Sequence, residues 1–482
     1  MVDGRTLTYA ELGTESCAVA AGLQHAGMQP GDAVVFSVRP SIEAVILILA
    51  IVRCGGVVVA ADPGMSPELF TARVAPLTPR WVMTESVLYA LGRLPPVRAA
   101  LEGRGVMLPN FDVPGARKVL VGPWPGVLTY RGLASRAQSP REAGIDGDAP
   151  AFIVFTSGTT SEPKAVVHTQ RSLSASLDTI SELLALEPGD RVYSDQLHMI
   201  VPALLAGATC FIPRSGFSAA RTLRDVRRFE PTHAFWVPAQ MQRLMSEPGS
   251  SFPLSLRTIL LGSGPVPAGF LRRCQQALPP STSVYAAYAL TEMLPVCWAD
   301  LREKIEFDGE GDLLGFPCAG IRLRIAADGE IFASGPNQCR GYLGFPPLRE
   351  VATGDVGRID RGRLVLLGRK KNMIIRDDRN IYPELIEGIV AALPGVRRCA
   401  MVGLYQADRI DELAVLVVDP EDGVDARHLE SHVRDVLWRG AHRIDIDARP
   451  DAIVAAHVPV RGRSSKVDRD ALRASLRGGL PC

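Results

Sequence analysis

The sequence predicts an α/β protein with a large N-terminal domain and a small C-terminal α/β domain, and three observations predict it. The chain has 482 residues, which exceeds the size at which a single core usually stops growing. Helix-like and strand-like segments alternate from the start, which is typical of doubly wound sheets. The run GRKKNM at 368–373 stands between the strand-like RLVLLG and a remainder that again mixes strands and helices. We therefore expect domains at 1–368 and 374–482, joined by a hinge at 369–373.

The alternation is carried by the first 61 residues. Thr8 and Glu11 have the spacing of a capping box at the start of a helix, and Gly31 with Asp32 marks the turn that follows. A strand, a helix and a second strand are expected next, at 33–38, 41–54 and 57–61. Because this order requires crossover connections, the sheet is predicted to be largely parallel.

Other stretches are interpreted from composition. Residues 102–150 are rich in glycine and proline with weak periodicity, so we expect a long irregular connection there. A strand is expected at 412–418 and a helix near 426–439. The apolar stretch 45–52 ends at Arg53 and is too short for the roughly 20 residues that span a bilayer, so it is expected to be a buried helix.

The composition is that of an ordinary globular enzyme. Lys plus Arg (53) nearly cancels Asp plus Glu (52), so the chain lacks the basic surface that sequence-independent nucleic-acid binding requires. The nine cysteines are an odd number without a CxxC pair, which predicts reduced thiols. The opening residues have no apolar signal-peptide core. We expect a cytoplasmic protein with no membrane span and no nucleic-acid partner.

A polar loop follows a predicted buried strand at 151–155. The loop is TSGTTSEPK at 156–164, in which Gly158 allows a tight turn that presents backbone N–H groups to an anion. Lys164 adds a positive charge, and hydroxyl donors are supplied by Ser157, Thr159 and Thr160. Pro163 stands where a Walker loop has glycine, so the loop is of another type. The pattern predicts a phosphate-handling loop, with a polar hairpin loop as the alternative.

This loop closely resembles the TSGTTGxPK signature of the adenylate-forming superfamily of acyl-CoA synthetases, peptide-synthetase adenylation domains and luciferases. Further motifs follow in the family's order: GSGP at 262–265, YALTE at 288–292, TGD at 353–355, GRKKNMII at 368–375, NIYPELIE at 380–387, and RGRSSKVDR at 461–469. The resemblance covers residues 5–475. It implies an acyl-CoA synthetase-like fold with a mobile C-terminal domain, and activation of a carboxylic acid by ATP and Mg²⁺.

The resemblance also implies a nucleotide site. The loop would hold the pyrophosphate portion of ATP with Thr156, Ser157, Gly158, Thr159, Thr160 and Lys164. The purine would stack on Tyr288. A close-approach wall on the other side of the base would consist of Gly262, Ser263 and Gly264. Asp355 would accept both ribose hydroxyls, and Arg369 would add a second ribose contact.

Catalytic roles follow from the same resemblance. Thr291 would bond the α-phosphate and Glu292 would be a magnesium ligand. Lys466 would supply charge between the carboxylate and the α-phosphate in the adenylation transition state. Lys371 stands at the hinge about which the C-terminal domain would swing, so that the thiol of CoA or of the phosphopantetheine arm of a carrier protein can enter.

The chain departs from the family pattern at several positions. Ser161, Ala289 and Ser465 replace glycines of the motifs. Asp377 and Asp378 stand where related synthetases commonly carry glycine beside the thiol tunnel. These two carboxylates would either disfavour a phosphorylated thiol such as CoA or point into water. They therefore bear on the second half-reaction and not on adenylation.

The acid substrate is predicted only by class. His198, Trp236 and Met241 are candidate pocket residues, although each is equally expected in an ordinary core. The segment THAFWVPAQ at 232–240 has no aspartate of the kind that holds an amino acid's ammonium group in peptide synthetases. A fatty, aryl or polyketide-type acid is therefore expected in place of an α-amino acid.

Two alternatives stay open. The fold could act as a β-lactone synthetase on a 3-hydroxy acid through the acyl-adenylate, since DPGM at 62–65 and ATCFIP at 208–213 resemble such enzymes. The chain could also be a catalytically silent, ATP-binding scaffold, because three motif glycines are lost. An active enzyme is favoured by the retained residues Lys164, Glu292, Asp355 and Lys466.

Overall fold

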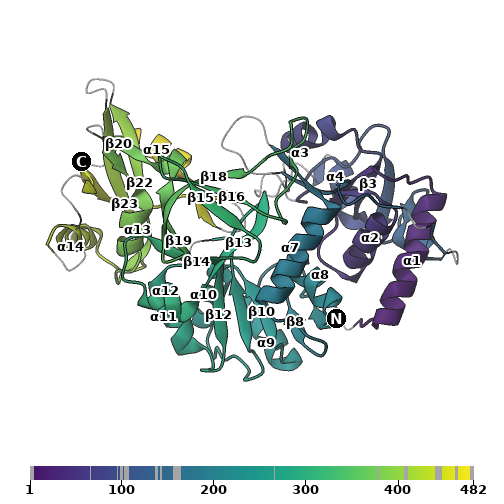
Figure 1. Cartoon of the computed structure of the whole chain (residues 1–482), viewed down its shortest axis with the longest axis horizontal. Coiled ribbons are helices and arrows are strands. Elements are labelled where there is room, and N and C mark those ends of the chain that lie inside the picture. The colour runs from purple at the N-terminus through teal and green to yellow at the C-terminus, as the bar shows by residue number, and fades with distance from the viewer. Residues whose placement is uncertain are drawn as a thin grey trace. The chain divides into compact units, whose positions relative to one another are not determined.

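The computed structural model describes residues 5–477, apart from 64, 66, 95, 98–100, 102–107, 136–138, 142–143, 156–163, 265, 377–378, 407–410, 440–443, 445–447 and 462–464 (Figure 1). The chain divides into two compact units. The first comprises 1–235, 290–295 and 335–351, and the second comprises 236–289, 296–334 and 352–482. This division is a different one from the domains predicted at 1–368 and 374–482, which stay a prediction.

The alternation predicted for the start of the chain is confirmed. Helix α1 (Tyr9–His25) begins after Thr8, whose hydroxyl accepts the backbone N–H of Glu11 while the Glu11 carboxylate accepts the backbone N–H of Thr8. The chain continues through β1 (Ala33–Ser37), α2 (Ile42–Arg53) and β2 (Val57–Ala60). The apolar stretch of α2 is packed in the core, as predicted. Among the described residues, none of the helices has the length and apolar character to cross a membrane.

The main sheet of the first unit has eight strands in the order β17-β7-β6-β2-β1-β3-β4-β5. The strands not yet introduced are β3 (Trp81–Glu85), β4 (Arg117–Val121), β5 (Leu128–Thr129), β6 (Pro150–Phe155), β7 (Ala165–Thr169) and β17 (Gly341–Tyr342). From β6 to β5 all neighbours are parallel, whereas β7 runs antiparallel to β6 and to β17. The prediction of a largely parallel sheet is therefore confirmed.

The helices of the first unit are α3 (Pro67–Val74), α4 (Ser86–Arg93), α6 (Tyr130–Ala134), α7 (Gln170–Leu183), α8 (Leu197–Leu205) and α9 (Ala219–Phe229), with a 3-10 turn η1 (Ala75–Leu77). Three further strands pair in the order β10-β8-β9: β8 (Arg191–Tyr193), β9 (Thr209–Phe211) and β10 (His233–Trp236). The core packs α1 and α2 against the parallel strands, with Leu23, Ile46 and Trp81 almost fully buried.

The prediction of an irregular connection over 102–150 is wrong for part of that segment. β4, β5 and α6 lie within it, and Val119 and Leu120 of β4 are fully buried. β4 pairs in parallel with β3, which provides the backbone hydrogen bonds that the weak local pattern did not predict. Tertiary pairing thus overrides a low local propensity.

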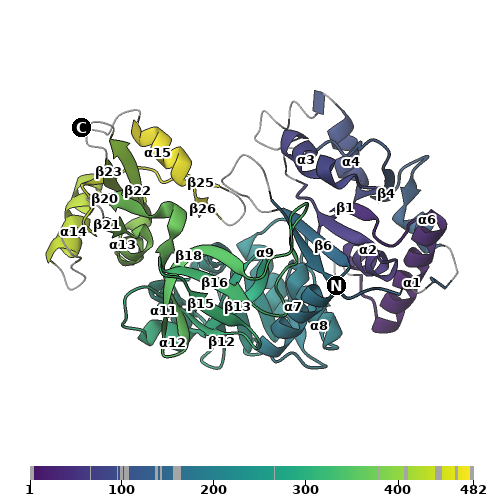
Figure 2. The same ribbon diagram turned by 45° about the horizontal axis from the view of Figure 1, so that its top comes forward.

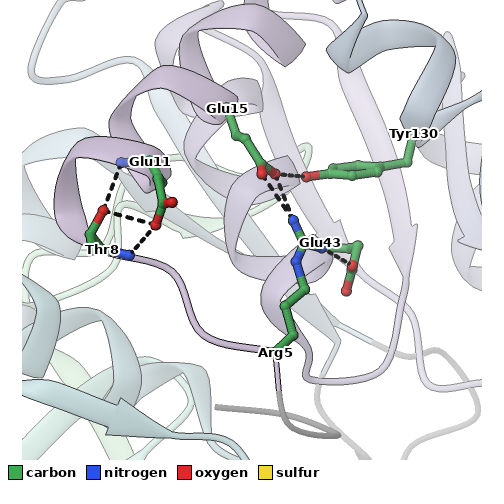
Figure 3. Close-up of polar contacts among 6 residues, drawn as sticks. All are labelled: Arg5, Thr8, Glu11, Glu15, Glu43 and Tyr130. Carbon is green, nitrogen blue, oxygen red and sulfur yellow. Dashed lines mark hydrogen bonds and ion pairs between the residues drawn. The ribbon is translucent and has the colours of Figure 1, made fainter.

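A small ionic cluster fastens the N-terminal residues to the first unit (Figure 3). The Arg5 guanidinium donates to Glu15 on α1 at 2.9 Å and to Glu43 on α2 at 2.6 Å. The hydroxyl of Tyr130 on α6 donates to the Glu15 carboxylate at 2.7 Å. The arginine is largely exposed, so each ion pair contributes at most about 1 kcal/mol, and the cluster mainly sets the path of the chain into α1.

The second unit is built on eight strands in the order β15-β16-β18-β19-β14-β13-β12-β11. Their bounds are β11 (Thr258–Leu261), β12 (Ser283–Leu290), β13 (Met293–Asp300), β14 (Asp312–Pro317), β15 (Arg322–Ile325), β16 (Glu330–Ser334), β18 (Val351–Asp360) and β19 (Arg363–Arg369). Three helices belong to this part of the chain, α10 (Pro238–Ser246), α11 (Ala268–Ala277) and α12 (Leu301–Glu306). β11 and β12 are parallel, and β18 and β19 are antiparallel.

The residues after β19 form an α/β arrangement with its own core (Figure 2). They comprise η2 (Lys370–Asn372), β20 (Ile374–Arg376), β21 (Arg379–Ile381), α13 (Pro383–Val390), β22 (Val396–Gln406), β23 (Asp411–Pro420), α14 (Ala426–Arg439), β24 (Ala452–Ala455), β25 (Val460–Arg461), β26 (Lys466–Val467) and α15 (Arg469–Arg477). The predicted strand at 412–418 and helix at 426–439 are confirmed. Leu416 of β23 packs in a cluster with α13 and α14, whereas Val415 packs in one with α15, so both faces of the sheet are covered.

Candidate functional site

The first group of candidate residues surrounds the end of β7 in the first unit. β6 ends at Phe155 and β7 begins at Ala165, so Lys164 lies immediately before a buried strand. The loop residues that precede it lie outside the described residues, namely Thr156, Ser157, Gly158, Thr159, Thr160 and Ser161. Their predicted roles are therefore not tested by the geometry.

Lys164 and Glu292 are brought together by Tyr342, which the sequence analysis did not single out. The Tyr342 hydroxyl donates to Oε1 of Glu292 at 2.9 Å, and the Lys164 ammonium lies 4.9 Å from the centre of the Tyr342 ring. Burial and the Glu292 charge raise the pKa of the Tyr342 hydroxyl, so it remains a protonated donor at neutral pH. The ring position follows from register, because Tyr342 of β17 pairs with Val166 of β7.

The backbone at Thr291 and Glu292 is held by two further contacts. The buried His168 of β7 has Nε2 at 2.8 Å from the Thr291 carbonyl oxygen. Burial lowers the pKa of His168, so the neutral ring, with its proton on Nε2, donates this bond. The backbone N–H of Cys339 donates to the Glu292 carbonyl at 2.8 Å. The segment that carries both predicted catalytic residues is thus fixed from two sides.

The second group of candidates surrounds Asp355 in the second unit. This side chain is 1% exposed and accepts the Tyr288 hydroxyl at 2.6 Å on Oδ2. The Arg369 guanidinium lies 2.8 Å from Oδ1, because Asp355 and Arg369 face each other across β18 and β19. Burial raises the pKa of the Asp355 carboxyl, and Arg369 and Tyr288 oppose that shift. Three predicted nucleotide contacts therefore lie together.

Several cations lie near Asp355. Lys466 of β26 interacts electrostatically with Asp355 and Arg369, and also with Arg461, its partner across the β25–β26 pair. Lys466 is exposed, but the protein around its ammonium and the charge of Arg369 lower its pKa. Lys371 in η2 shows the same effect, with burial the larger cause and Arg369 next. Glu384 and Asp470 are the other carboxylates that interact here, with Asp355 and with Lys371 respectively.

The predicted purine wall and Tyr288 lie at one edge of a parallel strand pair. Residues 262–264 follow the carboxyl end of β11, and Tyr288 lies near the carboxyl end of β12. The register pairs Leu261 with Ala286, two residues before Tyr288. Gly264 has the side chain of Pro238 at 3.6 Å from where a Cβ would stand. Carboxyl ends of parallel strands are the usual place for ligands in such sheets.

The motif positions that have lost glycine differ from each other in backbone conformation. Ser465, immediately before Lys466, has φ of 50°, in the left-handed region that favours glycine. Ala289 lies in the extended strand β12, and its φ is not positive. Alanine therefore fits this position without backbone strain. Ser161, Asp377 and Asp378 lie outside the described residues.

The predicted hinge is a 3-10 turn with contacts on both sides. Lys370 pairs with Asp328 at 2.6 Å and with Glu330 at 2.7 Å. The Asn372 side-chain amide donates to Glu384 of α13 at 2.7 Å. No movement is implied by these contacts alone, and the role of Lys371 as a hinge stays a prediction.

The three candidate pocket residues are all largely enclosed by protein. His198 on α8 packs edge-on against Phe235 with ring centres 4.9 Å apart, and burial lowers its pKa to about 4. Trp236 is 3% exposed, and Met241 on α10 is fully buried. His198 belongs to the first unit and the other two to the second, so a common pocket stays a prediction.

A magnesium site would depend on few protein ligands. Within the described ranges there is no group of three or more His, Cys, Asp and Glu side chains that could hold a metal. Mg²⁺ is usually bound by one or two carboxylates together with substrate phosphates and waters. Glu292 fits that pattern, since only its Oε1 is occupied by Tyr342.

Comparison with known proteins places these residues in a family context. The family model described as AMP-binding enzyme matches residues 1–343. A feruloyl-CoA synthase from an Amycolatopsis species is 30% identical, over 87% of this chain and 85% of that protein. Two olefin beta-lactone synthetases, from Stenotrophomonas maltophilia and Xanthomonas campestris, are 29% and 28% identical, over 83% and 87% of this chain and 79% and 82% of those proteins.

A solved structure shares the fold over the whole chain. The crystal structure of an anthranilate CoA ligase in complex with anthranoyl-AMP superposes with a TM-score of 0.82 and 18% sequence identity. The match covers 100% of this chain and 94% of that one. The predicted fold class is thereby confirmed.

Proposed function

The chain belongs to the AMP-binding enzyme family, and we propose that it uses ATP and Mg²⁺ to convert a carboxylic acid into an acyl-adenylate with release of pyrophosphate. One observation carries this proposal. Arg369 pairs with the buried Asp355 at 2.8 Å, and Lys371 and Lys466 interact electrostatically with both of these residues. Arg461 interacts with the two lysines, and the other carboxylates that interact here are Glu384 with Asp355 and Asp470 with Lys371. Cations held near one another favour the arrival of an anion. Adenylation needs such a place, because a carboxylate and an α-phosphate repel each other.

In the reaction, a carboxylate oxygen forms a bond to the α-phosphorus and the bond to pyrophosphate breaks. Lys466 would offset the negative charge on the two reacting groups, and Thr291 would bond the α-phosphate. Lys466 suits this role because its ammonium has no carboxylate within ion-pair distance among the described residues. Its charge would therefore be directed to the substrates.

The rest of the nucleotide would be held by both groups of residues. Tyr288 and the backbone at 262–264 would enclose the purine, and Asp355 with Arg369 would bind the ribose. Lys164 and the loop at 156–160 would hold the pyrophosphate portion. Glu292 would bind Mg²⁺, which when bound offsets phosphate charge.

The acyl group would then pass to the thiol of CoA or of a carrier protein's phosphopantetheine, with AMP leaving. The relatives named as CoA synthase and CoA ligase support a thiol acceptor. The enclosed, mostly apolar candidates His198, Trp236 and Met241 support a hydrophobic or aryl acid. Rotation of residues 374–482 about Lys371 would serve both half-reactions, as part of this proposal.

Acid-dependent exchange of labelled pyrophosphate into ATP tests the proposal. The panel would contain fatty, aryl, 3-hydroxy and α-amino acids, with and without Mg²⁺. We expect exchange with at least one fatty or aryl acid and none without metal. Retained ATP binding with no exchange for any acid would support the silent scaffold instead.

A second candidate is formation of a β-lactone from a 3-hydroxy acid, which is favoured by the similarity to two olefin beta-lactone synthetases. Here the substrate's own 3-hydroxyl oxygen would bond the acyl carbon, lose its proton and displace AMP. A 3-hydroxy acid would then release AMP with no thiol present, whereas the matched acid without the hydroxyl would not. AMP release that requires a thiol for both acids would exclude this candidate.

A further inference from the structure

Tyr342 lies between Lys164 and Glu292, two residues that the proposed function assigns to the same triphosphate. Its hydroxyl donates to Oε1 of Glu292 at 2.9 Å, and its ring lies 4.9 Å from the Lys164 ammonium. The three residues come from three segments of the first unit, the start of β7, the β12–β13 connection and β17. A single side chain therefore contacts both a cation and a carboxylate of the candidate site.

Backbone hydrogen bonds around Tyr342 fix the direction in which its side chain leaves the strand. β17 pairs with β7 through Gly341 and Tyr342, and the Leu343 N–H donates to the Ala165 carbonyl at 2.9 Å. The Cys339 N–H bonds the Glu292 carbonyl. The backbones of Tyr342 and Glu292 are thus both held by hydrogen bonds to neighbouring segments.

We propose that Tyr342 is a positioning residue that orients Glu292 toward Mg²⁺ through its hydroxyl and Lys164 toward the phosphates through its ring. This inference rests on the proposed function, because it concerns metal and nucleotide at that same site. With Oε1 bonded to the hydroxyl, the Glu292 carboxylate is held in one rotamer, and its other oxygen remains for the metal. The ring face attracts the ammonium and limits the directions that Lys164 samples.

The two halves of this role can be separated by substitution. Tyr342→Phe removes the hydroxyl and keeps the ring, whereas Tyr342→Leu removes both. Calorimetric titration of ATP into the full-length chain would be performed with Mg²⁺ and again in EDTA, so that metal-dependent and metal-independent binding are measured without turnover. The Mg²⁺ dependence and the kcat–KM split of pyrophosphate exchange provide a second readout.

For Tyr342→Phe we expect the half-saturating Mg²⁺ concentration to rise about tenfold, with ATP affinity in EDTA unchanged. For Tyr342→Leu we expect the same Mg²⁺ effect and, in addition, about threefold weaker ATP binding in EDTA, because the Lys164 contact is lost. Tyr130→Phe is the matched control, since it removes another tyrosine–glutamate hydrogen bond of the same unit, to Glu15 at 2.7 Å. It should leave both titrations unchanged.

Three results would overturn the inference. The first is wild-type Mg²⁺ dependence in Tyr342→Phe, which would show that the hydroxyl does not orient Glu292. The second is an equal loss in EDTA and in Mg²⁺ for both variants, which would show a purely structural role. The third is that the wild-type protein binds ATP with the same affinity with and without Mg²⁺. That result would also contradict the role of Glu292 as a metal ligand. If pyrophosphate exchange by the wild type did not depend on an added carboxylic acid, that result would count against the proposed function alone.

Discussion

Two carboxylates of the candidate site, Glu292 and Asp355, each accept a tyrosine hydroxyl, but their burial and their charged neighbours differ. Glu292 of the first unit accepts from Tyr342 at 2.9 Å, and Asp355 of the second accepts from Tyr288 at 2.6 Å. Asp355 is almost fully buried and has Arg369 at 2.8 Å. In the described part of the chain no cation forms an ion pair with Glu292.

The difference indicates separate roles for the two sites. A buried carboxylate that is matched by a guanidinium is a fixed acceptor, suited to neutral hydroxyl groups of a ligand. A partly exposed carboxylate held only by neutral donors retains its attraction for a metal ion. Lys466 and Lys371 both interact electrostatically with Asp355.

The largest effect is expected from Lys466→Ala. If this ammonium offsets charge only in the transition state, exchange of pyrophosphate should fall about 100- to 1,000-fold while ATP affinity changes little. Arg473→Ala is a control, because it removes a cation of α15 that pairs with Asp470 at 2.9 Å. If Lys466→Ala formed AMP from an acid at the wild-type rate, the role assigned to Lys466 in adenylation would be wrong.

Asp355→Asn should have the next largest effect, because it leaves Arg369 without its counter-charge. We expect a loss of about 1 to 2 kcal/mol in unfolding free energy, measured by denaturant titration. The same change in the exposed Asp328, which pairs with Lys370 at 2.6 Å, should lower the unfolding free energy by clearly less, because solvent screens that ion pair. Equal costs would show that burial of the carboxylate is not what distinguishes the two ion pairs.

Arg461→Gln tests the cations near Asp355 through the pH dependence of the exchange rate. Burial and the charges of Arg369 and Arg461 lower the pKa of Lys466, so the protonated, active form is lost at a lower pH than for an ordinary lysine. Removing the Arg461 charge should raise this pKa and move the alkaline fall of the exchange rate to higher pH. A fall at the same pH in both proteins would mean that Arg461 does not act on Lys466.

The smallest effects are expected at the positions that have lost glycine. Ser465→Gly should stabilise the chain by up to about 1 kcal/mol, because φ of 50° costs a serine but not a glycine. Ala289→Gly should destabilise it by roughly 0.5 to 1 kcal/mol, since an extended strand offers no relief and glycine loses more entropy. Thermal unfolding of both variants measures the contrast, and effects of the same sign would contradict it.

Much of the fold followed from local patterns. The Thr8–Glu11 capping box, the buried helix α2 and the strand and helix of the C-terminal residues depend on groups close together in the chain. The strands and the helix within 102–150 were not predicted from local patterns, because β4 is stabilised by pairing with β3 and not by its own composition. Motif order likewise indicated Lys164, Glu292 and Asp355, but not Tyr342 or His168.

The sequence by itself determined the α/β class, the resemblance to the adenylate-forming superfamily and the identity of the charged residues, because capping, periodicity and motif spacing are short-range properties. Only the tertiary structure decided that Tyr342 joins Lys164 to Glu292, that His168 holds the carbonyl of Thr291, and that Lys466 lies near Arg369. Such contacts join residues far apart in the chain, for example His168 and Thr291, which are 123 positions apart. They exist only after the sheets have brought distant segments into register, and local patterns carry no record of that register.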